Sequence, residues 1–416
     1  MATWTIHLEG GPRRVNHAAV AIGSKIYSFG GYCSGDVIDD KDPLDVHVLD
    51  TENLRWMKLT PGIVHQNRVY SQSELFETGD VTKLSGAVPF QRYGHSVVAH
   101  NGKAYVWGGR NDDYGACNLL HEYDPENNVW RKLEICGFNP ASRDGHTAVV
   151  WNQKMYVFGG FEEDTQRFSQ ETYVFDFTCN RWKEMATKGK LPMWRDFHTA
   201  SIIDGVMYIF GGRSDHTGQF HTSHDVYDDR LSSLNLTTGV WTELNVAGIR
   251  PGGRRSHSTW VHGGKMYLFG GYLGSRNVHY NELYSFDPST MVWSLAAVRG
   301  KYPLPRRRHC SAVVNGKVYL FGGTMPNPLA CHAQVNAGTP GVNALADLCD
   351  LHVLDFSPSL KQLAMGTVIN ELKVPSNNMF DALQKEIPTD IRFELYCQVT
   401  PNCVANPVAG RHDQSG

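Results

Sequence analysis

The chain has 416 residues, which is enough for one large closed β architecture and an appendage. Its 39 basic and 42 acidic residues nearly balance, so bulk charge indicates neither a nucleic-acid partner nor an anionic membrane surface. The N-terminus lacks the apolar core of a signal peptide, and no run of about 18 apolar residues predicts a membrane span. Nine cysteines without paired short spacings argue against a disulfide framework and favour the cytosol, the nucleus or both.

One phrase occurs six times along the chain with a fixed internal spacing. It consists of an arginine, a histidine three residues later and a Gly-Gly pair that opens thirteen residues after the histidine. The arginines are Arg14, Arg92, Arg143, Arg195, Arg254 and Arg306. The histidines are His17, His95, His146, His198, His257 and His309, and the glycine pairs open at Gly30, Gly108, Gly159, Gly211, Gly270 and Gly322. A repeat of about fifty residues is typical of a β-propeller, in which one sheet recurs as a blade.

In chain order, the first predicted element is a strand at Trp4–Leu8, directly before the first repeat arginine. Each unit then offers four short apolar runs bounded by turns, which in the third unit are residues 147–151, 154–158, 171–176 and 181–185. An Asp or Asn six residues before a Trp marks the fourth run in units one to five, but the sixth unit lacks this pair. We therefore predict an all-β, six-bladed propeller in which the N-terminal strand completes the last blade and closes the ring.

The positions of the glycine pairs and tryptophans resemble the kelch family of β-propellers over residues 1–356. Two segments depart from the regular period, residues 61–90 between the first two blades and residues 325–346 within the last blade. We expect both to be mobile surface loops. The predicted organisation is a propeller over residues 1–356, a helical segment over residues 357–395 and a flexible tail over residues 396–416.

Two short amphipathic helices are predicted after the last blade. Ser359 is a suitable N-cap for the first, in which Leu360, Leu363, Ala364 and Val368 share one face. The second begins near Pro388, which a first helical turn tolerates, and repeats an apolar residue every four positions: Ile387, Ile391 and Leu395. On composition alone, packing against the propeller and binding a partner are equally supported for these faces.

A residue present in all six units is expected to hold the blades rather than to bind one ligand. We therefore interpret the repeat arginines and histidines as hydrogen-bonded groups that brace the turns between blades. A ring of metal-binding histidines would need them to converge, and sixfold placement keeps them apart. Function is sought at the positions that differ between units: the residue after each glycine pair and the two residues before each histidine.

Charges segregate among these variable positions. Units four to six contribute Arg213, Arg255, Arg307 and Arg308, whereas units three and four contribute Asp144 and Asp196. If these loops line one mouth of the channel, the pocket suits a ligand that carries an anion and a cation a few residues apart. The alternative is that these loop charges pair with one another in solvent.

Other chemistry has little support in the sequence. His216, His221 and His224 share one polar loop, but no cysteine or carboxylate pattern accompanies them, and we predict neither a metal site nor a cofactor. Nucleophile motifs, phosphate-binding loops and paired-carboxylate signatures are lacking, so we predict no catalytic residues and no enzymatic activity.

The C-terminal segments carry a more specific resemblance. Ser359-Leu360, Ala364 and Val368 are similar to the box by which substrate receptors of ubiquitin ligases bind Elongin C, although that box has cysteine where this chain has Ala364. The second helix matches the pattern that selects cullin-2, at Ile387, Pro388, Ile391 and Leu395. With the propeller, these elements resemble the kelch-propeller substrate receptors of cullin-2 ubiquitin ligases over nearly the whole chain. The resemblance implies Elongin B/C and cullin-2 as partners.

That family recognises C-terminal degrons, usually protein ends that finish in glycine. The resemblance implies that arginines bind the free α-carboxylate through charge-assisted bidentate contacts. Arg213 matches one such arginine, while Gly218 stands where a relative has a second one and Arg255-Ser256 stand where it has Ser-Trp. We infer that Arg255 replaces the lost charge. The residues assigned to the carboxylate are Arg213, Arg255, Ser256 and Arg308, and those assigned to upstream ligand residues are Asp144, Asp196 and Arg110.

The chain itself ends in Gly416, with Arg411 upstream. Its tail is therefore a hypothetical occupant of its own pocket or of a neighbouring copy, and an unstructured terminus is the alternative. The sequence as a whole predicts a non-catalytic substrate receptor of a cullin-2 ubiquitin ligase. A kelch scaffold that binds a cytoskeletal or nuclear partner is the first alternative, and a propeller enzyme is the second.

Overall fold

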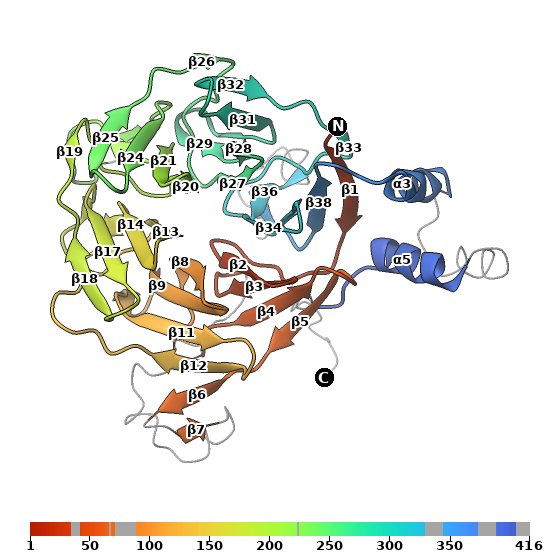
Figure 1. The fold of residues 1–416 in the computed structure, drawn as a ribbon, viewed down its shortest axis with the longest axis horizontal. Coiled ribbons are helices and arrows are strands. Elements are labelled where there is room, and N and C mark those ends of the chain that lie inside the picture. The colour runs from red at the N-terminus through yellow and green to blue at the C-terminus, as the bar shows by residue number, and fades with distance from the viewer. Residues whose placement is uncertain are drawn as a thin grey trace, which may run out of the picture.

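The predicted six-bladed propeller is confirmed. The computed structural model describes residues 1–34, 42–65, 68–70, 89–222, 224–328, 344–372 and 388–404. Six antiparallel sheets are arranged as blades around a central channel, and two helices lie beside the blade that contains both ends of the propeller (Figure 1). No described helix is long and apolar enough to cross a membrane.

Each blade contains four antiparallel strands, numbered from the channel outwards. Blade one has β2 (Ala18–Ile22), β3 (Lys25–Phe29), β4 (Val46–Asp50) and β5 (Arg55–Leu59). Blade two has β8 (Tyr93–His100), β9 (Lys103–Asn111), β11 (Leu120–Asp124) and β12 (Val129–Lys132). Blade three has β13 (Thr147–Trp151), β14 (Lys154–Phe158), β17 (Thr172–Asp176) and β18 (Arg181–Glu184).

The second half follows the same plan. Blade four has β20 (Thr199–Ile203), β21 (Val206–Phe210), β24 (Ser232–Asn235) and β25 (Val240–Glu243). Blade five has β27 (Ser258–His262), β28 (Lys265–Phe269), β31 (Leu283–Asp287) and β32 (Val292–Leu295). Blade six has β34 (Cys310–Val314), β35 (Lys317–Phe321), β38 (Leu351–Asp355) and, from the other end of the chain, β1 (Thr3–Leu8).

Short additional strands lie in the connections. Four of them pair in parallel with the outer strand of the next blade: β6 (Gly62–His65), β19 (Lys188–Gly189), β26 (Ala247–Gly248) and β33 (Arg299–Gly300). The others extend hairpins: β7 (Arg68–Tyr70), β10 (Gly115–Ala116), β15 (Phe161–Glu162), β16 (Arg167–Phe168), β22 (Ser214–Asp215), β23 (Asp225–Val226), β29 (Tyr272–Leu273), β30 (Val278–His279), β36 (Thr324–Pro326) and β37 (Leu345–Asp347). The two segments expected to be loops therefore begin or end in strands, and their central parts lie outside the described residues.

The arginine of the repeated phrase is tied to the glycine pair of its own blade. In blades two to six, Nη1 of the arginine donates to the carbonyl of the first glycine, with N–O distances between 2.8 and 3.3 Å. The five arginines are at most 1% exposed. A buried guanidinium needs such acceptors, because an unsatisfied polar group in the interior is costly.

The histidine of the phrase connects each blade to the preceding one. A Cβ added to the first glycine of any blade would stand only 2.3–3.0 Å from Cε1 of the next blade's histidine, and these glycines have φ between 57° and 71°. Only glycine satisfies both the close approach and the left-handed backbone. Because His17 of blade one packs on Gly322 of blade six, the same contact runs around the whole ring.

A third sixfold contact supplies the apolar core. The tryptophan of each outer strand packs on the aromatic residue that precedes the glycine pair of the preceding blade, with ring centroids 4.9–5.8 Å apart. The pairs are Trp56–Phe321, Trp130–Phe29, Trp182–Trp107, Trp241–Phe158, Trp293–Phe210 and Trp4–Phe269. Such edge-to-face aromatic pairs add roughly 0.5–1.5 kcal/mol each beyond the area they bury.

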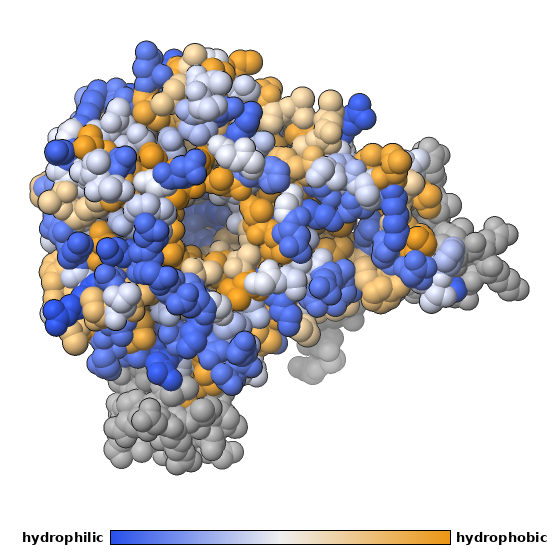
Figure 2. All heavy atoms as spheres, viewed as in Figure 1, coloured by the Kyte–Doolittle hydropathy of each residue, from blue (hydrophilic) through white to orange (hydrophobic). Residues whose placement is uncertain are grey.

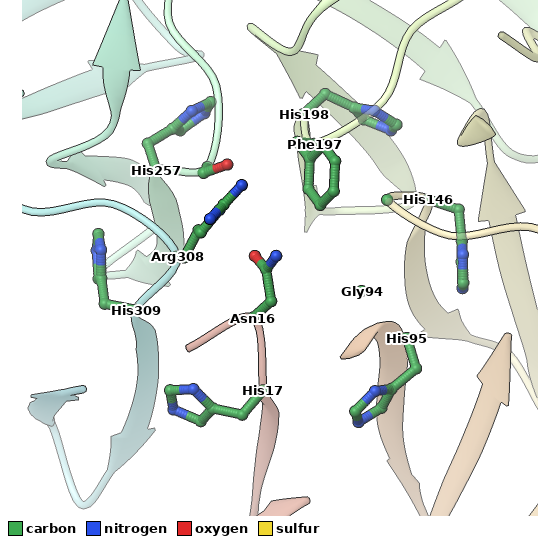
Figure 3. A pocket seen from close by; sticks show the side chains of 12 residues that line it. Asn16, His17, Gly94, His95, His146, Phe197, His198, His257, Arg308 and His309 are labelled. Atoms are coloured by element: carbon green, nitrogen blue, oxygen red, sulfur yellow. The ribbon is translucent and has the colours of Figure 1, made fainter. Parts of the chain in front are cut away.

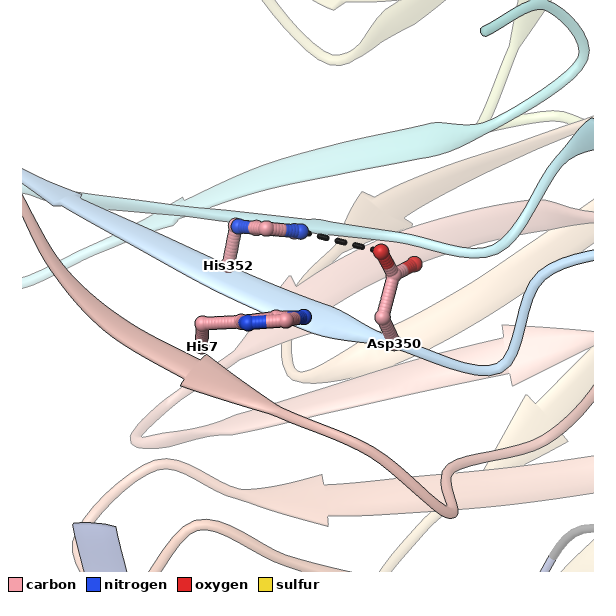
Figure 4. A group of neighbouring side chains, drawn as sticks. All are labelled: His7, Asp350 and His352. Carbon is pink, nitrogen blue, oxygen red and sulfur yellow. Dashed lines mark hydrogen bonds and ion pairs between the residues drawn. The ribbon is translucent and has the colours of Figure 1, made fainter. Parts of the chain in front are cut away.

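The ring closes where β1 pairs with β38, in the register His7 opposite His352. These two imidazoles stack with centroids 4.4 Å apart, and His352 is hydrogen-bonded to Asp350 (Figure 4). His7, Asp350 and His352 have potential metal ligands within 4.8 Å of one another. Buried Arg306, however, occupies both Asp350 oxygens at 2.6 and 2.7 Å, and Lys301 Nζ lies 3.0 Å from His7 Nδ1. These cations disfavour a metal ion, so we interpret the group as part of the closure.

The predicted helices are confirmed. Helix α3 (Leu360–Leu372) begins at Ser359, which forms a capping box with Gln362: the Gln362 N–H donates to Ser359 Oγ and the Ser359 N–H donates to Gln362 Oε1. Helix α5 (Thr389–Val399) has Pro388 at its N-cap and runs four residues beyond the predicted end. Both helices contact β1.

We expect the propeller to lose stability as the pH falls below about 6.5. Burial, and next the neighbouring repeat arginine, lowers the pKa of all six repeat histidines, to about 3 for His17, His95 and His257. An unfolded histidine takes up a proton near pH 6.5 and these do not, so each weakens the fold by up to about 1.4 kcal/mol per pH unit. Urea unfolding at pH 7.5, 6.5 and 5.5 measures this slope, and equal stability at all three values would contradict it.

Candidate functional site

The variable positions of the repeat face one another in every blade. An isolated backbone bridge joins the residue two places before the histidine to the residue after the glycine pair, as between Asp196 and Arg213 or Arg255 and Tyr272. The repeat arginine and histidine hold one partner, and the glycine pair positions the other. Variable side chains from all blades are thereby gathered at one mouth of the channel, and Figure 2 shows the hollow at the centre of the ring.

A cavity of about 620 Å³ occupies this mouth. Five of the sequence-predicted residues line it: Arg110, Asp144, Arg213, Arg255 and Arg308. Ser256 instead lines a smaller cavity of about 130 Å³, together with the repeat histidines. Three residues border both spaces and separate them: Asn16, Phe197 and Arg308 (Figure 3).

Asp196 has a different role from the one predicted. Its side chain is fully buried, and both carboxylate oxygens accept from Arg213, at 3.1 Å from Nε and 2.5 Å from Nη2. Burial raises the pKa of Asp196, whereas Arg213 opposes this shift. Asp196 therefore cannot contact an upstream ligand residue directly; it positions the Arg213 guanidinium, whose side chain remains 19% exposed at the cavity.

The other arginines are held more loosely. Nη1 of Arg308 donates to the Tyr32 hydroxyl at 2.6 Å. Arg255 lies 3.9 Å from the Asp225 carboxylate, beyond hydrogen-bond distance. Arg307 stacks on Tyr272, with its guanidinium carbon 4.0 Å from the ring centre. Burial, and next the charge of Arg308, lowers the pKa of Arg307 to about 10. This side of the cavity therefore has more positive charge than its own carboxylates neutralise.

Asp144 lies on the opposite side and lacks a cation partner. Its side chain is 6% exposed, and among the described residues no hydrogen bond or ion pair reaches its carboxylate. Burial, and next the charge of Asp196, raises the pKa of Asp144 to about 7. Arg110, nearby at the rim, is occupied by Glu163 at 3.2 Å and Asp112 at 3.5 Å.

The sequence prediction selected only charged residues and missed the aromatic ones. Tyr32 and Tyr93 form an edge-to-face pair with centroids 5.2 Å apart, and both line the cavity with Phe197. All three stand at the variable positions of the repeat. Comparison of the six units was thus the signal that identifies them, and the choice of charge alone excluded them.

The helical segment has a second exposed surface. Three apolar side chains of α3 point away from the propeller: Leu360 is 85% exposed, Leu363 41% and Val368 37%. Ala364 is exposed between them, while Met365 packs inward. On α5, Ile391 is half-buried and Leu395 is buried, so Leu395 cannot meet a partner as predicted. Ile387 and Gly416 lie outside the described residues.

The residues that follow α5 anchor the helices. Asn402 is buried, accepts the Trp56 N–H at 3.0 Å and donates to the Leu54 carbonyl. Arg55 donates to the Thr400 carbonyl at 2.9 Å. The helices are therefore fixed to blade one as well as to β1.

Comparison with known proteins agrees with this architecture. Residues 94–323 match the family model of the KLHDC2/KLHL20/DRC7 Kelch-repeats domain, and residues 13–62 match a Kelch motif. The chain is 40% identical to Kelch domain-containing protein 3 of Homo sapiens over 412 residues, which is 99% of this chain and 100% of that protein. The Rattus norvegicus protein of that name shows the same identity and coverage. Host cell factor 2 of Homo sapiens is 30% identical over 59% of this chain and 32% of its own length.

We expect Asp144→Asn to stabilise the protein at pH 8 and to have no effect near pH 4. The wild-type carboxylate must ionise in a buried site, since its pKa is about 7 in the fold against 3.8 in the unfolded chain. That difference corresponds to about 2–4 kcal/mol at high pH and is lost where both states are protonated. Thermal unfolding of both proteins at pH 4, 6 and 8 measures it. Asp113→Asn, at an exposed residue of the same cavity, is the control, and an equal gain there would contradict the assignment.

Proposed function

Since the chain belongs to the kelch-propeller family that includes Kelch domain-containing protein 3, we propose that it is the substrate-recognition subunit of a cullin-2 ubiquitin ligase. In this proposal the propeller binds protein C-termini that end in glycine, and the helical segment joins the ligase. The protein itself catalyses no reaction; its ligands are placed for ubiquitin transfer and then degraded by the proteasome.

The observation that carries the proposal is the arginine-rich side of the cavity. Arg213, Arg255 and Arg308 face a space closed below by the residues that border both cavities, and their charge exceeds that of the carboxylates around them. A free α-carboxylate supplies the missing negative charge and accepts bidentate guanidinium contacts. An internal peptide segment has no such group.

Arg213 is already oriented for this contact. Asp196 occupies its Nε and one terminal nitrogen, so the guanidinium loses little rotational freedom when a ligand binds. The pair also explains why substitution of Arg213 is a poor test: the variant would leave Asp196 buried without a partner. Arg255, which has no close partner carboxylate, is the better residue to change.

Asp144 is suited to a basic residue upstream of the chain end. A cation beside it would remove the cost of its buried negative charge. The carboxylate and the arginine cluster border one cavity from different blades, so a peptide can meet both. We propose that Arg110 acts at the rim together with Glu163 and Asp112.

The exposed face of α3 is the proposed Elongin C contact. Leu360, Leu363 and Val368 form an apolar helix face, and Ala364 lets a partner approach closely between them. For cullin-2, Pro388 and the accessible part of Ile391 remain available, together with Phe393 and Tyr396, which are 60% and 47% exposed. Leu395 has no part in this contact.

We expect a peptide with a C-terminal glycine and an upstream arginine to bind as the free acid and to bind at least about 30-fold more weakly as the amide, because amidation removes the charge that the arginines pair. Fluorescence polarisation with labelled peptides measures both. Arg255→Ala should weaken free-acid binding about 5- to 100-fold, whereas Arg250→Ala, an exposed arginine outside the cavity, should not. Equal binding of acid and amide would reject the receptor and favour a kelch scaffold.

We expect Leu360→Asp with Val368→Asp to abolish co-purification with Elongin B/C and cullin-2 without lowering the melting temperature. Both side chains are exposed in the free protein, so a charge there disrupts only the partner contact. Lys361→Ala on the same helix is the control, because its ion pair with Glu394 is exposed and contributes little. Unchanged co-purification would exclude this helix face as the ligase contact.

A further inference from the structure

A closed circle of backbone hydrogen bonds surrounds the channel. In every blade, the residue immediately before the repeat histidine donates its N–H to the carbonyl of its counterpart in the preceding blade, at 2.7–3.1 Å. The circle consists of Asn16, Gly94, Gly145, Phe197, Ser256 and Arg308. Because the last bond joins blade one to blade six, each of these peptide groups is held from both sides.

All six residues have a left-handed backbone, with φ between 49° and 66°. Glycine adopts this conformation freely and asparagine tolerates it, but it is strained for bulky side chains. Phe197, at 49°, and Arg308, at 61°, are the two bulky members. Such strain persists only where the surroundings enforce it and is concentrated at functional positions. Arg308 belongs to the carboxylate cluster, which leaves Phe197 to be explained.

Phe197 forms part of the floor of the upper cavity. It borders both the 620 Å³ and the 130 Å³ spaces, and its ring projects into the channel beside Asn16 and Arg308 (Figure 3). The ring lies over Gly145, where a Cβ would stand 3.3 Å from Phe197 Cε2. The glycines at positions 94 and 145 contribute no side chain to the floor, so Phe197 and Arg308 determine most of its depth.

The floor at Phe197 is also rigid. Its N–H donates to Gly145 at 2.7 Å and its carbonyl accepts from Ser256 at 2.9 Å. Its sequence neighbour Asp196 is fixed by Arg213, so the ring and that guanidinium share one short stretch of backbone. A wall held this firmly cannot move aside for an additional methyl group, because overpacking must then displace the ligand.

We propose that Phe197 is the specificity-determining residue that restricts the bound chain end to glycine. The arginines hold the terminal carboxylate, and the Phe197 ring fills the space that a side chain on the last residue would need. This inference rests on the proposed binding of C-termini but assigns the selectivity to a residue that carries no charge and contacts no other part of the carboxylate cluster.

The test compares peptides that differ only in a terminal glycine or alanine, bound to wild type, Phe197→Gly and Ser256→Gly. Both variants remove a non-glycine residue from the circle, where glycine is favoured, so both should fold with unchanged or higher melting temperatures. Wild type and Ser256→Gly should prefer the glycine peptide by about tenfold or more, as one methyl group in a tight pocket allows. Phe197→Gly should bind both peptides within about threefold of each other, through a gain for alanine.

The outcomes separate the two proposals. If wild type binds neither peptide, the proposed function fails. If wild type binds the glycine peptide and Phe197→Gly keeps the full preference, or weakens both peptides equally, Phe197 is not the selective residue. Phe197→Leu, which keeps a large side chain in the same backbone conformation, should retain at least part of the preference, and its complete loss there would also overturn the inference.

Discussion

The bond from each repeat arginine to the carbonyl of its own blade's first glycine is the constraint on which the site depends. It fixes the turn before the histidine against the end of the second strand, in five blades with nearly the same distance. The histidine then transmits that position to the preceding blade through the same glycine. Residues beside these tied points are free to vary while their backbone stays in place, which is why one scaffold can carry a specific pocket.

The arginines of the scaffold and those of the cavity differ in how their charge is balanced. Arg143, Arg195 and Arg306 are buried and have carboxylates at 2.6–2.9 Å. In the cavity, only Arg213 has such a partner, whereas Arg255 and Arg307 do not. Like charges are gathered there without internal compensation, and Asp144 is kept apart from them on the other side. An arrangement that is unfavourable in the free protein becomes favourable when a ligand of matching charge is bound.

The sequence predicted the fold well because the fold depends on residues that recur. Six copies of one phrase, and a missing tryptophan in the sixth, determined both the blade number and the closure by β1. It also predicted which loops form the cavity. It could not predict that Asp196 is occupied by Arg213, since the two are seventeen residues apart and nothing in one sequence shows that they pair. Nor could it predict that Leu395 faces inward, because its four-residue spacing is equally typical of a face that packs on the propeller.

The residue least predictable from sequence is the one whose backbone is most informative. Phe197 is an ordinary aromatic residue in the chain, and five of its six counterparts in the circle offer no common residue type. Its meaning comes from a conformation that is shared by all six positions and unfavourable for phenylalanine. The scaffold imposes that conformation whichever residue is present, so a large side chain there is directed into the channel and cannot rotate away with its backbone. The same circle that closes the propeller thereby determines how deep a ligand can enter.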